Sequence, residues 1–206
     1  MKYRLIRLCF GLSLTISAII IAGCGPKSYE KQHYILDTKR ESSAVVSNNT
    51  HIIEVRRFTI ASAFNSKSLI YRTSEFKYES DFYNEFLVSP TAMITEKIRN
   101  WLAASGIAHR VLDPGSNVDP THIIEGNVVS LYGDFRTKSS PKAIMEIRIF
   151  LLDKKAETES GIVFGKTYNA SVDLETRNPE DLVSAFDRCL VEILTDLEKD
   201  LAENLP

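Results

Sequence analysis

Two periods of alternating apolar and polar residues run along the chain, and they predict a domain of strands and helices. Period two is clearest over residues 142–153, where Glu146 and Arg148 occupy one face and only apolar side chains occupy the other. That apolar face consists of Ala143, Met145, Ile147, Ile149 and Leu151. Residues 161–172 alternate in the same way, and residues 121–135 form a third long strand candidate.

Two segments show the helical period of 3.6 residues and carry the residues that typically start a helix. The first has Ser89 as N-cap, Pro90 at the first helical position and Gly106 at its end. Its apolar face consists of Met93, Ile94, Ile98, Trp101 and Leu102. The second begins at Asn178 and Pro179. Its apolar stripe consists of Leu182, Phe186, Cys189, Leu190, Ile193, Leu194, Leu197 and Leu201, which predicts a packed, unreactive thiol at Cys189.

Shorter strands are predicted at residues 29–36, 51–60 and 68–79, and the polar stretches 37–50 and 113–120 are typical of loops. The order of elements is strands, helix, strands, helix. It predicts one α/β domain of the α+β kind, in which two helices cover a mixed or antiparallel sheet. No internal repeat interrupts this order.

The first residues of the chain have the layout of a bacterial secretion signal. Lys2, Arg4 and Arg7 precede an apolar run at residues 8–21 that ends in small residues. A helix that spans a membrane needs roughly 20 apolar residues, and this run is shorter and interrupted by polar ones. A permanent membrane helix is therefore the weaker interpretation.

The four residues Ile21, Ala22, Gly23 and Cys24 resemble the lipobox of bacterial lipoproteins. The resemblance implies that residues 1–23 are a signal peptide and that Cys24 is lipidated, with acyl chains such as palmitate. Residues 24–28 would then be a short tether before a domain at residues 29–206. Two or three chains anchor a protein stably where one is marginal. A structural cysteine at this position is the alternative, and Gly25, in place of Asp, favours the outer membrane.

Composition and motifs offer no chemistry that would make the chain an enzyme. The formal net charge of −2 does not suggest nucleic acid. The fragment 161–167 ends like a phosphate-binding loop but lacks its glycine spacing, and the four histidines are scattered. Once Cys9 leaves with the signal and Cys24 carries lipid, Cys189 is alone and cannot form an intramolecular disulfide. We therefore expect no catalytic residue, no metal and no cofactor.

An aromatic cluster precedes the first predicted helix. It consists of Phe58, Phe64, Tyr71, Phe76, Tyr78, Phe82, Tyr83 and Phe86. One interpretation packs all of them in the core. The other places some of them on a partner surface, because aromatic residues are enriched at interface cores and in apolar ligand sites. The spacing within residues 75–86 is too irregular for one strand to bury every ring, which predicts that some face outwards.

The chain resembles the ABC-type transport auxiliary lipoprotein family in residues 69–113. The segments 33–36, 122–135 and 142–153 also resemble segments of that family and occur in the same order as they do there. The resemblance implies a periplasm-facing outer-membrane lipoprotein that docks the MCE-domain (mammalian cell entry) subunit of an ABC transporter for phospholipid or another lipid. The expected partner or lipid contacts are Tyr71, Arg72, Phe76, Tyr78, Phe82, Tyr83 and Phe86.

Two other functions stay open on the sequence alone. The chain could itself be a periplasmic lipid-binding lipoprotein, or a structural assembly factor of another envelope complex. The transported lipid, direct lipid binding and assembly into a homo-oligomer are not determined by the sequence.

Overall fold

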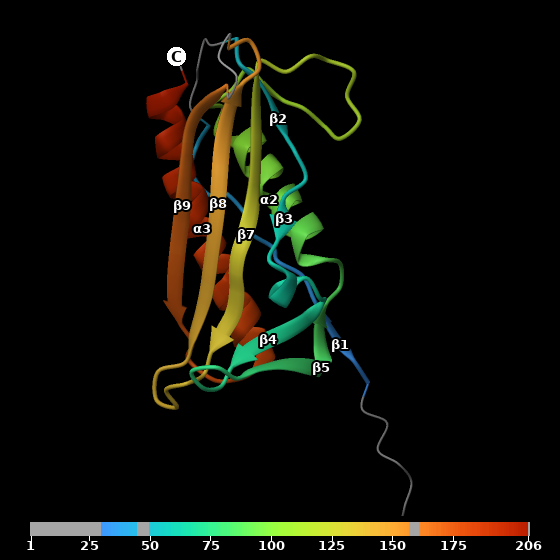
Figure 1. The fold of residues 1–206 in the computed structure, drawn as a ribbon, viewed down its shortest axis with the longest axis vertical. Coiled ribbons are helices and arrows are strands. Elements are labelled where there is room, and N and C mark those ends of the chain that lie inside the picture. The colour runs from blue at the N-terminus through green and yellow to red at the C-terminus, as the bar shows by residue number, and fades with distance from the viewer. Residues whose placement is uncertain (1–29, 45–49, 157–160, 206) are drawn as a thin grey trace, which may run out of the picture. The chain divides into compact units, whose positions relative to one another are not determined.

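Strand β7 (His122–Asp134) organises the sheet of this protein, for which we analysed a computed structural model that describes residues 30–44, 50–156 and 161–205. Strand β8 (Lys142–Asp153) pairs antiparallel with β7 over its whole length, and β9 (Ile162–Asp173) pairs antiparallel with β8. These three long strands stand side by side in Figure 1.

The other edge of β7 is occupied by short parallel strands in succession. They are β2 (Ile52–Val55), β3 (Thr59–Ile60) and β4 (Ser68–Arg72), and β6 (Arg110–Val111) extends the sheet beyond β2. Strand β2 pairs with the first residues of β7, whereas β4 pairs with its last ones, Gly133 and Asp134. The short strands therefore pair with successive parts of β7, from its first residues to its last.

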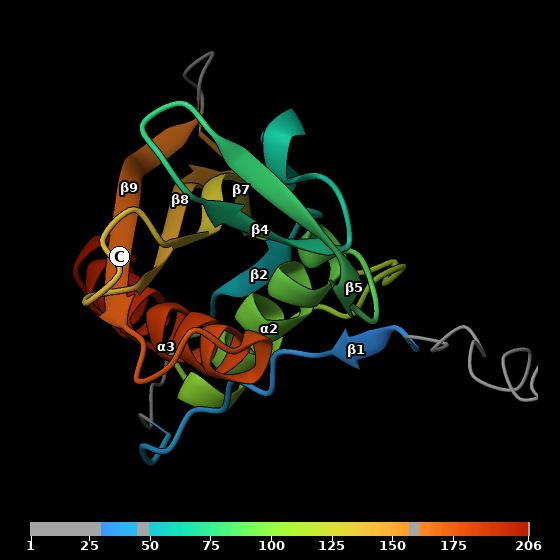
Figure 2. The same cartoon turned by 90° about the horizontal axis from the view of Figure 1, so that it is seen from below.

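The sheet continues from β4 into β5 (Tyr78–Phe86), which is antiparallel to β4. Strand β1 (Gln32–Tyr34) then adds in parallel to the last residues of β5. Strands β4 and β5 cross the end of the domain where β7 finishes, as the view from below shows (Figure 2). Within the described residues the sheet has nine strands, parallel and antiparallel, so the predicted mixed sheet is confirmed.

Helices α2 (Pro90–Ser105) and α3 (Pro179–Asn204) lie on one side of the long strands (Figure 2). The side chains of Ser89 and Asn178 accept hydrogen bonds from backbone amides of the first turns, and Gly106 ends α2 in the left-handed conformation with φ of 73°. Every residue of both predicted apolar faces is buried. The structure confirms both predicted helices, for which the capping residues and the apolar periodicity had indicated the same ranges.

The core lies between the helices and the apolar face of the long strands. All five predicted inward residues of β8 are fully buried, as is Cys189 on α3. A short 3₁₀ helix, η2 (Ser62–Phe64), adds Phe64 to this core. On β7 the ring of Phe58 crosses Gly126, where a Cβ atom would come within 2.4 Å of the ring. Only glycine permits that approach.

Two of the predicted short strands are each broken in the structure. Residues 51–60 form β2 and β3, because Phe58 turns into the core and its amide donates to Thr95 Oγ1 at 3.1 Å. Residues 68–79 form β4, a turn closed by Thr73 N and Lys77 O at 2.9 Å, and the start of β5. The predictions of single strands over these ranges were wrong in extent. The first break depends on a contact with a distant part of the chain, and the second is a local turn.

Candidate functional site: the aromatic surface of β5

Strand β5 and the turn before it carry large apolar side chains that are exposed to solvent. Phe76 is 88% exposed, Phe82 69% and Tyr83 43%, and Tyr78 is similar to Tyr83. We call these four residues the aromatic surface of β5. Singly exposed apolar residues are common, but four in one strand and its turn make this surface the candidate site.

A bulge in β5 explains why neighbouring residues both face outwards. The pairs Ser68–Glu85 and Ile70–Ser80 show that β5 has more residues than β4 between these points. Inside the bulge, Asp81 Oδ1 accepts hydrogen bonds from the backbone amides of Tyr83 and Asn84, at 2.9 and 3.0 Å. A bulge bends a strand and re-aims its side chains.

Asp81 also fixes the bulge to the rest of the sheet. Its Oδ2 accepts hydrogen bonds at 2.9 Å from the Tyr71 hydroxyl on β4 and from Asn84 Nδ2. Partial burial would raise the pKa of Asp81, but the hydrogen bonds from Asn84, Tyr83 and Tyr71 lower it below its ordinary value. Asp81 is therefore a charged acceptor at neutral pH that holds the bulge.

The bulge presents Phe82 and Tyr83 as a pair beside the start of the domain. Their ring centroids are 5.1 Å apart in an edge-to-face arrangement. The ammonium group of Lys31, just before β1, lies 5.1 Å from the centre of the Phe82 ring and 2.9 Å from Glu85 Oε2. We call Lys31, Phe82 and Tyr83 the bulge group.

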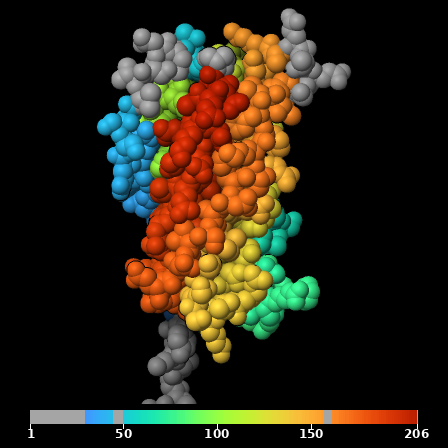
Figure 3. Space-filling view, turned by 90° about the vertical axis from the view of Figure 1, so that its left-hand side faces the viewer, coloured from blue at the N-terminus to red at the C-terminus, as the bar shows by residue number. Residues whose placement is uncertain are grey.

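At the other end of β5, Phe76 and Tyr78 lie beside Arg72. The Arg72 guanidinium lies 5.5 Å from the centre of the Tyr78 ring, and its Nη2 donates to the Glu75 carbonyl at 2.7 Å. Its Nε is buried without a hydrogen-bond partner in the described parts of the chain, where Arg72 also makes no ion pair. We call Arg72, Phe76 and Tyr78 the hairpin group. The turn that carries it projects from the body of the domain (Figure 3).

Two predicted contact residues do not belong to the exposed surface. Phe86 is 2% exposed, and its ring lies 6.3 Å from that of Phe186 on α3. Tyr71 is partly buried, its ring stacks on that of Phe135 with centroids 5.0 Å apart, and its hydroxyl donates a hydrogen bond to Asp81. Burial raises the pKa of its hydroxyl, and the hydrogen bond to Asp81 raises it further. Phe86 is thus a core residue, whereas Tyr71 positions the bulge.

A groove lies on the helical side of the domain. It has a volume of about 960 Å³ and lies between the segment 39–42, Trp101 and Ile107, and the second half of α3. Figure 3 shows α3 flanked by the early part of the chain and by β9.

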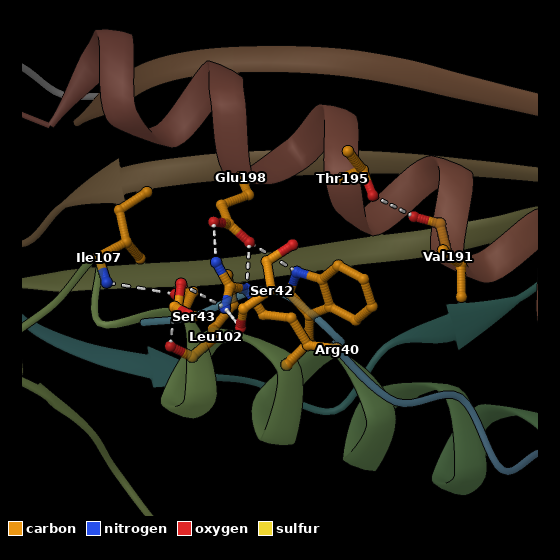
Figure 4. Close-up of polar contacts among 10 residues, drawn as sticks. Arg40, Ser42, Ser43, Leu102, Ile107, Val191, Thr195 and Glu198 are labelled. Carbon is orange, nitrogen blue, oxygen red and sulfur yellow. Dashed lines mark hydrogen bonds and ion pairs between the residues drawn. The ribbon is translucent and has the colours of Figure 1, made fainter. Parts of the chain in front are cut away.

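The polar groups at this groove bond to one another. Arg40 is 5% exposed and holds both carboxylate oxygens of Glu198, at 2.9 and 2.8 Å (Figure 4). Trp101 Nε1 donates to the same carboxylate at 2.9 Å. The hydrogen bond from Arg40 lowers the pKa of Glu198. This cluster fastens the early chain to α3.

Reactive chemistry is not evident in the described residues. No three His, Cys, Asp or Glu side chains among them are grouped to hold a metal. Burial raises the pKa of the Cys189 thiol to about 12, so it is not a thiolate at neutral pH. The phosphate-loop-like fragment lies mostly in β9, as its apolar residues predict. In this same part of the chain, the helices are too short or too polar to cross a membrane.

Sequence reasoning missed several residues of these features. Asp81 looked like an ordinary surface charge, and the exposed Ile35, Leu87 and Val88 beside β5 were not singled out. Arg40 and Glu198 are 158 residues apart in the chain, so no local pattern joins them. The sequence does carry one signal for the bulge, because Asp81 and Asn84 are both good local acceptors.

The structure is a mixed α/β domain with exposed aromatic side chains on and before β5. The family model of the ABC-type transport auxiliary lipoprotein component matches residues 34–198. The chain belongs to this family, and it is therefore a lipoprotein of a transport system, anchored to a membrane of the cell envelope. No curated protein matches it. The proposed lipidation site Cys24 lies outside the described residues.

Solved structures show the same fold at low sequence identity. Protein XCC0632 from Xanthomonas campestris, of family DUF330, has a TM-score of 0.64 at 15% identity, with 82% of this chain and 91% of that chain covered. An uncharacterized protein has 0.67 at 9%, with 84% and 99% covered. The hypothetical protein CT253 from Chlamydia trachomatis has 0.51 at 12%, with 76% and 100% covered. These likenesses concern the fold alone.

Proposed function

We propose that this lipoprotein is the non-catalytic outer-membrane component of an ABC system for phospholipid or another lipid. In this proposal Cys24 carries the acyl chains, and the domain docks the MCE-domain subunit of the transporter in the periplasm. The ATPase elsewhere supplies the energy, so the docking component needs no reactive group. Family membership supports the transport role, and Gly25 after Cys24 supports the outer membrane.

The hairpin group is the proposed docking site for the transporter. The observation that best supports this site is the exposure of Phe76, whose ring is almost fully exposed on a turn that projects from the domain. Next to it, the Arg72 guanidinium is oriented by Tyr78 and the Glu75 carbonyl. It forms no ion pair among the described residues, although its charge acts on the nearby Asp134 carboxylate and lowers the pKa of that group. Aromatic and arginine side chains are the residues that most often carry binding energy. A planar guanidinium suits a carboxylate of the partner.

Capture of the MCE-domain subunit by the acylated, full-length protein tests this proposal. Phe76→Ala is expected to weaken capture about tenfold, since a central aromatic anchor contributes more than 1 kcal/mol. Val118→Ala is the matched control, because Val118 is an exposed apolar residue in the loop before β7, the end of that strand opposite to β4. Melting temperatures of both variants should stay near that of the native protein. Undiminished capture by Phe76→Ala and by Arg72→Ala would contradict the proposed site.

The groove beside α3 favours a second candidate function, direct binding of lipid. Its volume is in the range of small-molecule pockets, and its walls combine Trp101, Val191 and Leu205 with the cations Lys39 and Lys199. A lysophospholipid would place its acyl chain on the apolar side chains and its phosphate near the two lysines. Trp101, the single tryptophan of the chain, reports on this directly. A saturable change of Trp101 fluorescence on addition of lysophospholipid would support this candidate. The change should be lost in Ala202→Trp, where the added ring fills the groove and its own emission is subtracted.

A further inference from the structure

The bulge group lies where the lipid tether reaches the domain. Strand β1 pairs with Asn84, Glu85 and Phe86, the last residues of β5. Lys31, the residue before β1, contacts the Phe82 ring. Lys31, near the start of the described domain, and the bulge are therefore in contact. Phe82 lies in the middle of β5, four residues from Tyr78 and six from Phe76, so the hairpin group is about 13 to 20 Å away along the strand.

The tether is too short to carry this surface far from a bilayer. Lys31 follows Cys24 by seven positions in the sequence, and a fully extended chain over seven positions spans at most about 25 Å. This step rests on the proposed lipidation of Cys24. An anchor of this length confines Lys31, and with it Phe82 and Tyr83, to the neighbourhood of the membrane surface.

The chemistry of the bulge group matches the boundary between headgroups and acyl chains. Tyr and other amphipathic aromatic rings concentrate at that boundary, and lysine can lie near lipid phosphates. Further exposed apolar residues follow at the same end of β5, namely Ile35, Leu87 and Val88. Three acidic residues are close. Glu30 precedes Lys31 in the chain, Glu85 is paired with Lys31 and His33, and Asp81 is occupied inside the bulge.

From these observations we infer that the bulge group is a membrane-contact surface, which seats the domain on the phospholipid bilayer that holds its acyl chains. Phe82 and Tyr83 insert at the interfacial level, and Lys31 lies at the level of the phosphates. The acyl anchor keeps the protein at the membrane, and the bulge sets the orientation of the domain there. The hairpin group, at the other end of β5, is left to face a protein partner.

Quenching by brominated phospholipids tests this inference on the acylated, full-length protein in vesicles of phosphatidylethanolamine and phosphatidylglycerol. The unsubstituted protein, whose single tryptophan is Trp101, is measured in parallel, and its quenching is subtracted. In Phe82→Trp, the added indole is expected to lose roughly half of its emission, as for a ring buried several ångströms into the interface. The matched control Val118→Trp, in the loop before β7, should lose none.

The outcomes separate this inference from the proposals on which it rests. Mass spectrometry of the N-terminal peptide reports acylation of Cys24 independently. If Cys24 is acylated and Phe82→Trp is quenched no more than Val118→Trp, the inference is wrong. If Phe82→Glu instead abolishes capture of the MCE-domain subunit while the domain stays folded, the surface binds protein and not lipid. Quenching of Phe82→Trp together with loss of capture only in Phe76→Ala would support both assignments.

Discussion

The helical side of the domain and the β5 end use the same residue types in opposite ways. On the helical side, aromatic rings and charged groups are buried and bonded to one another, as Trp101, Arg40 and Glu198 are. At the β5 end, Phe76 and Phe82 stand in solvent, while Asp81 uses its hydrogen bonds to keep the bulge in shape.

This difference teaches that polar clusters in the domain serve two purposes. Around Glu198, the cluster joins distant segments and its loss should show as lower stability. Around Asp81, the cluster shapes a surface, and its loss should alter what the surface presents. A folded domain gains no stability from exposing aromatic rings, and this is the reason for proposing a contact surface at the β5 end.

The sharpest test of the comparison uses two phenylalanines of the same strand. Phe86→Ala should lower the free energy of unfolding by about 3 to 5 kcal/mol, because it empties a core position against α3. Phe82→Ala should change it by less than about 0.5 kcal/mol, as is usual for surface substitutions. Urea unfolding of both variants measures the difference. Comparable losses in the two would show that the bulge group belongs to the core after all.

The next largest effect is expected at the ion pair of the helical side. Arg40→Ala leaves the partly buried Glu198 carboxylate with Trp101 as its remaining described donor, which should cost about 2 kcal/mol. Replacing both residues, as Arg40→Met with Glu198→Leu, should recover much of that loss, since no unpaired charge remains. Thermal melts of the single and double variants measure this. A double variant no more stable than Arg40→Ala would mean that the ion pair itself, and not the stranded charge, determines the stability.

The parts of the fold that follow from local pattern could be predicted from the sequence. Ser89, Asn178 and Gly106 cap the helices through residues within a few positions, and the inward face of β8 follows from strict alternation. In both cases the deciding interactions are either local or determined by the burial of one face. Residues 142–153 and 178–201 therefore behave as their patterns predict.

The candidate site was predictable only in outline. The crowding of aromatic residues indicated that some would face outwards, but which ones depends on the bulge, and the bulge depends on Asp81 meeting Tyr71 across two strands. Similarly, Phe86 could be placed in the core only once α3 was known to bring Phe186 against it. Contacts between distant segments decide these points, and no local period encodes them.

The smallest predicted effect concerns Asp81 and depends on pH. In Asp81→Asn the side chain can no longer accept from both the Tyr71 hydroxyl and Asn84 Nδ2, so the loss at neutral pH should be about 1 to 2 kcal/mol. The native pKa of Asp81 is lowered from 3.8, so its contribution is complete above that value and is lost as the pH falls through the lower native pKa. Unfolding free energies of the native protein and the variant should therefore converge as the pH falls below the lowered native pKa of Asp81. Glu85→Gln is the control, since its carboxylate lies outside the bulge cluster and pairs with Lys31. A difference between Asp81→Asn and the native protein that persists unchanged into acid would show that the charge of Asp81 does not hold the bulge. The surface it shapes would then owe its geometry to the rings alone.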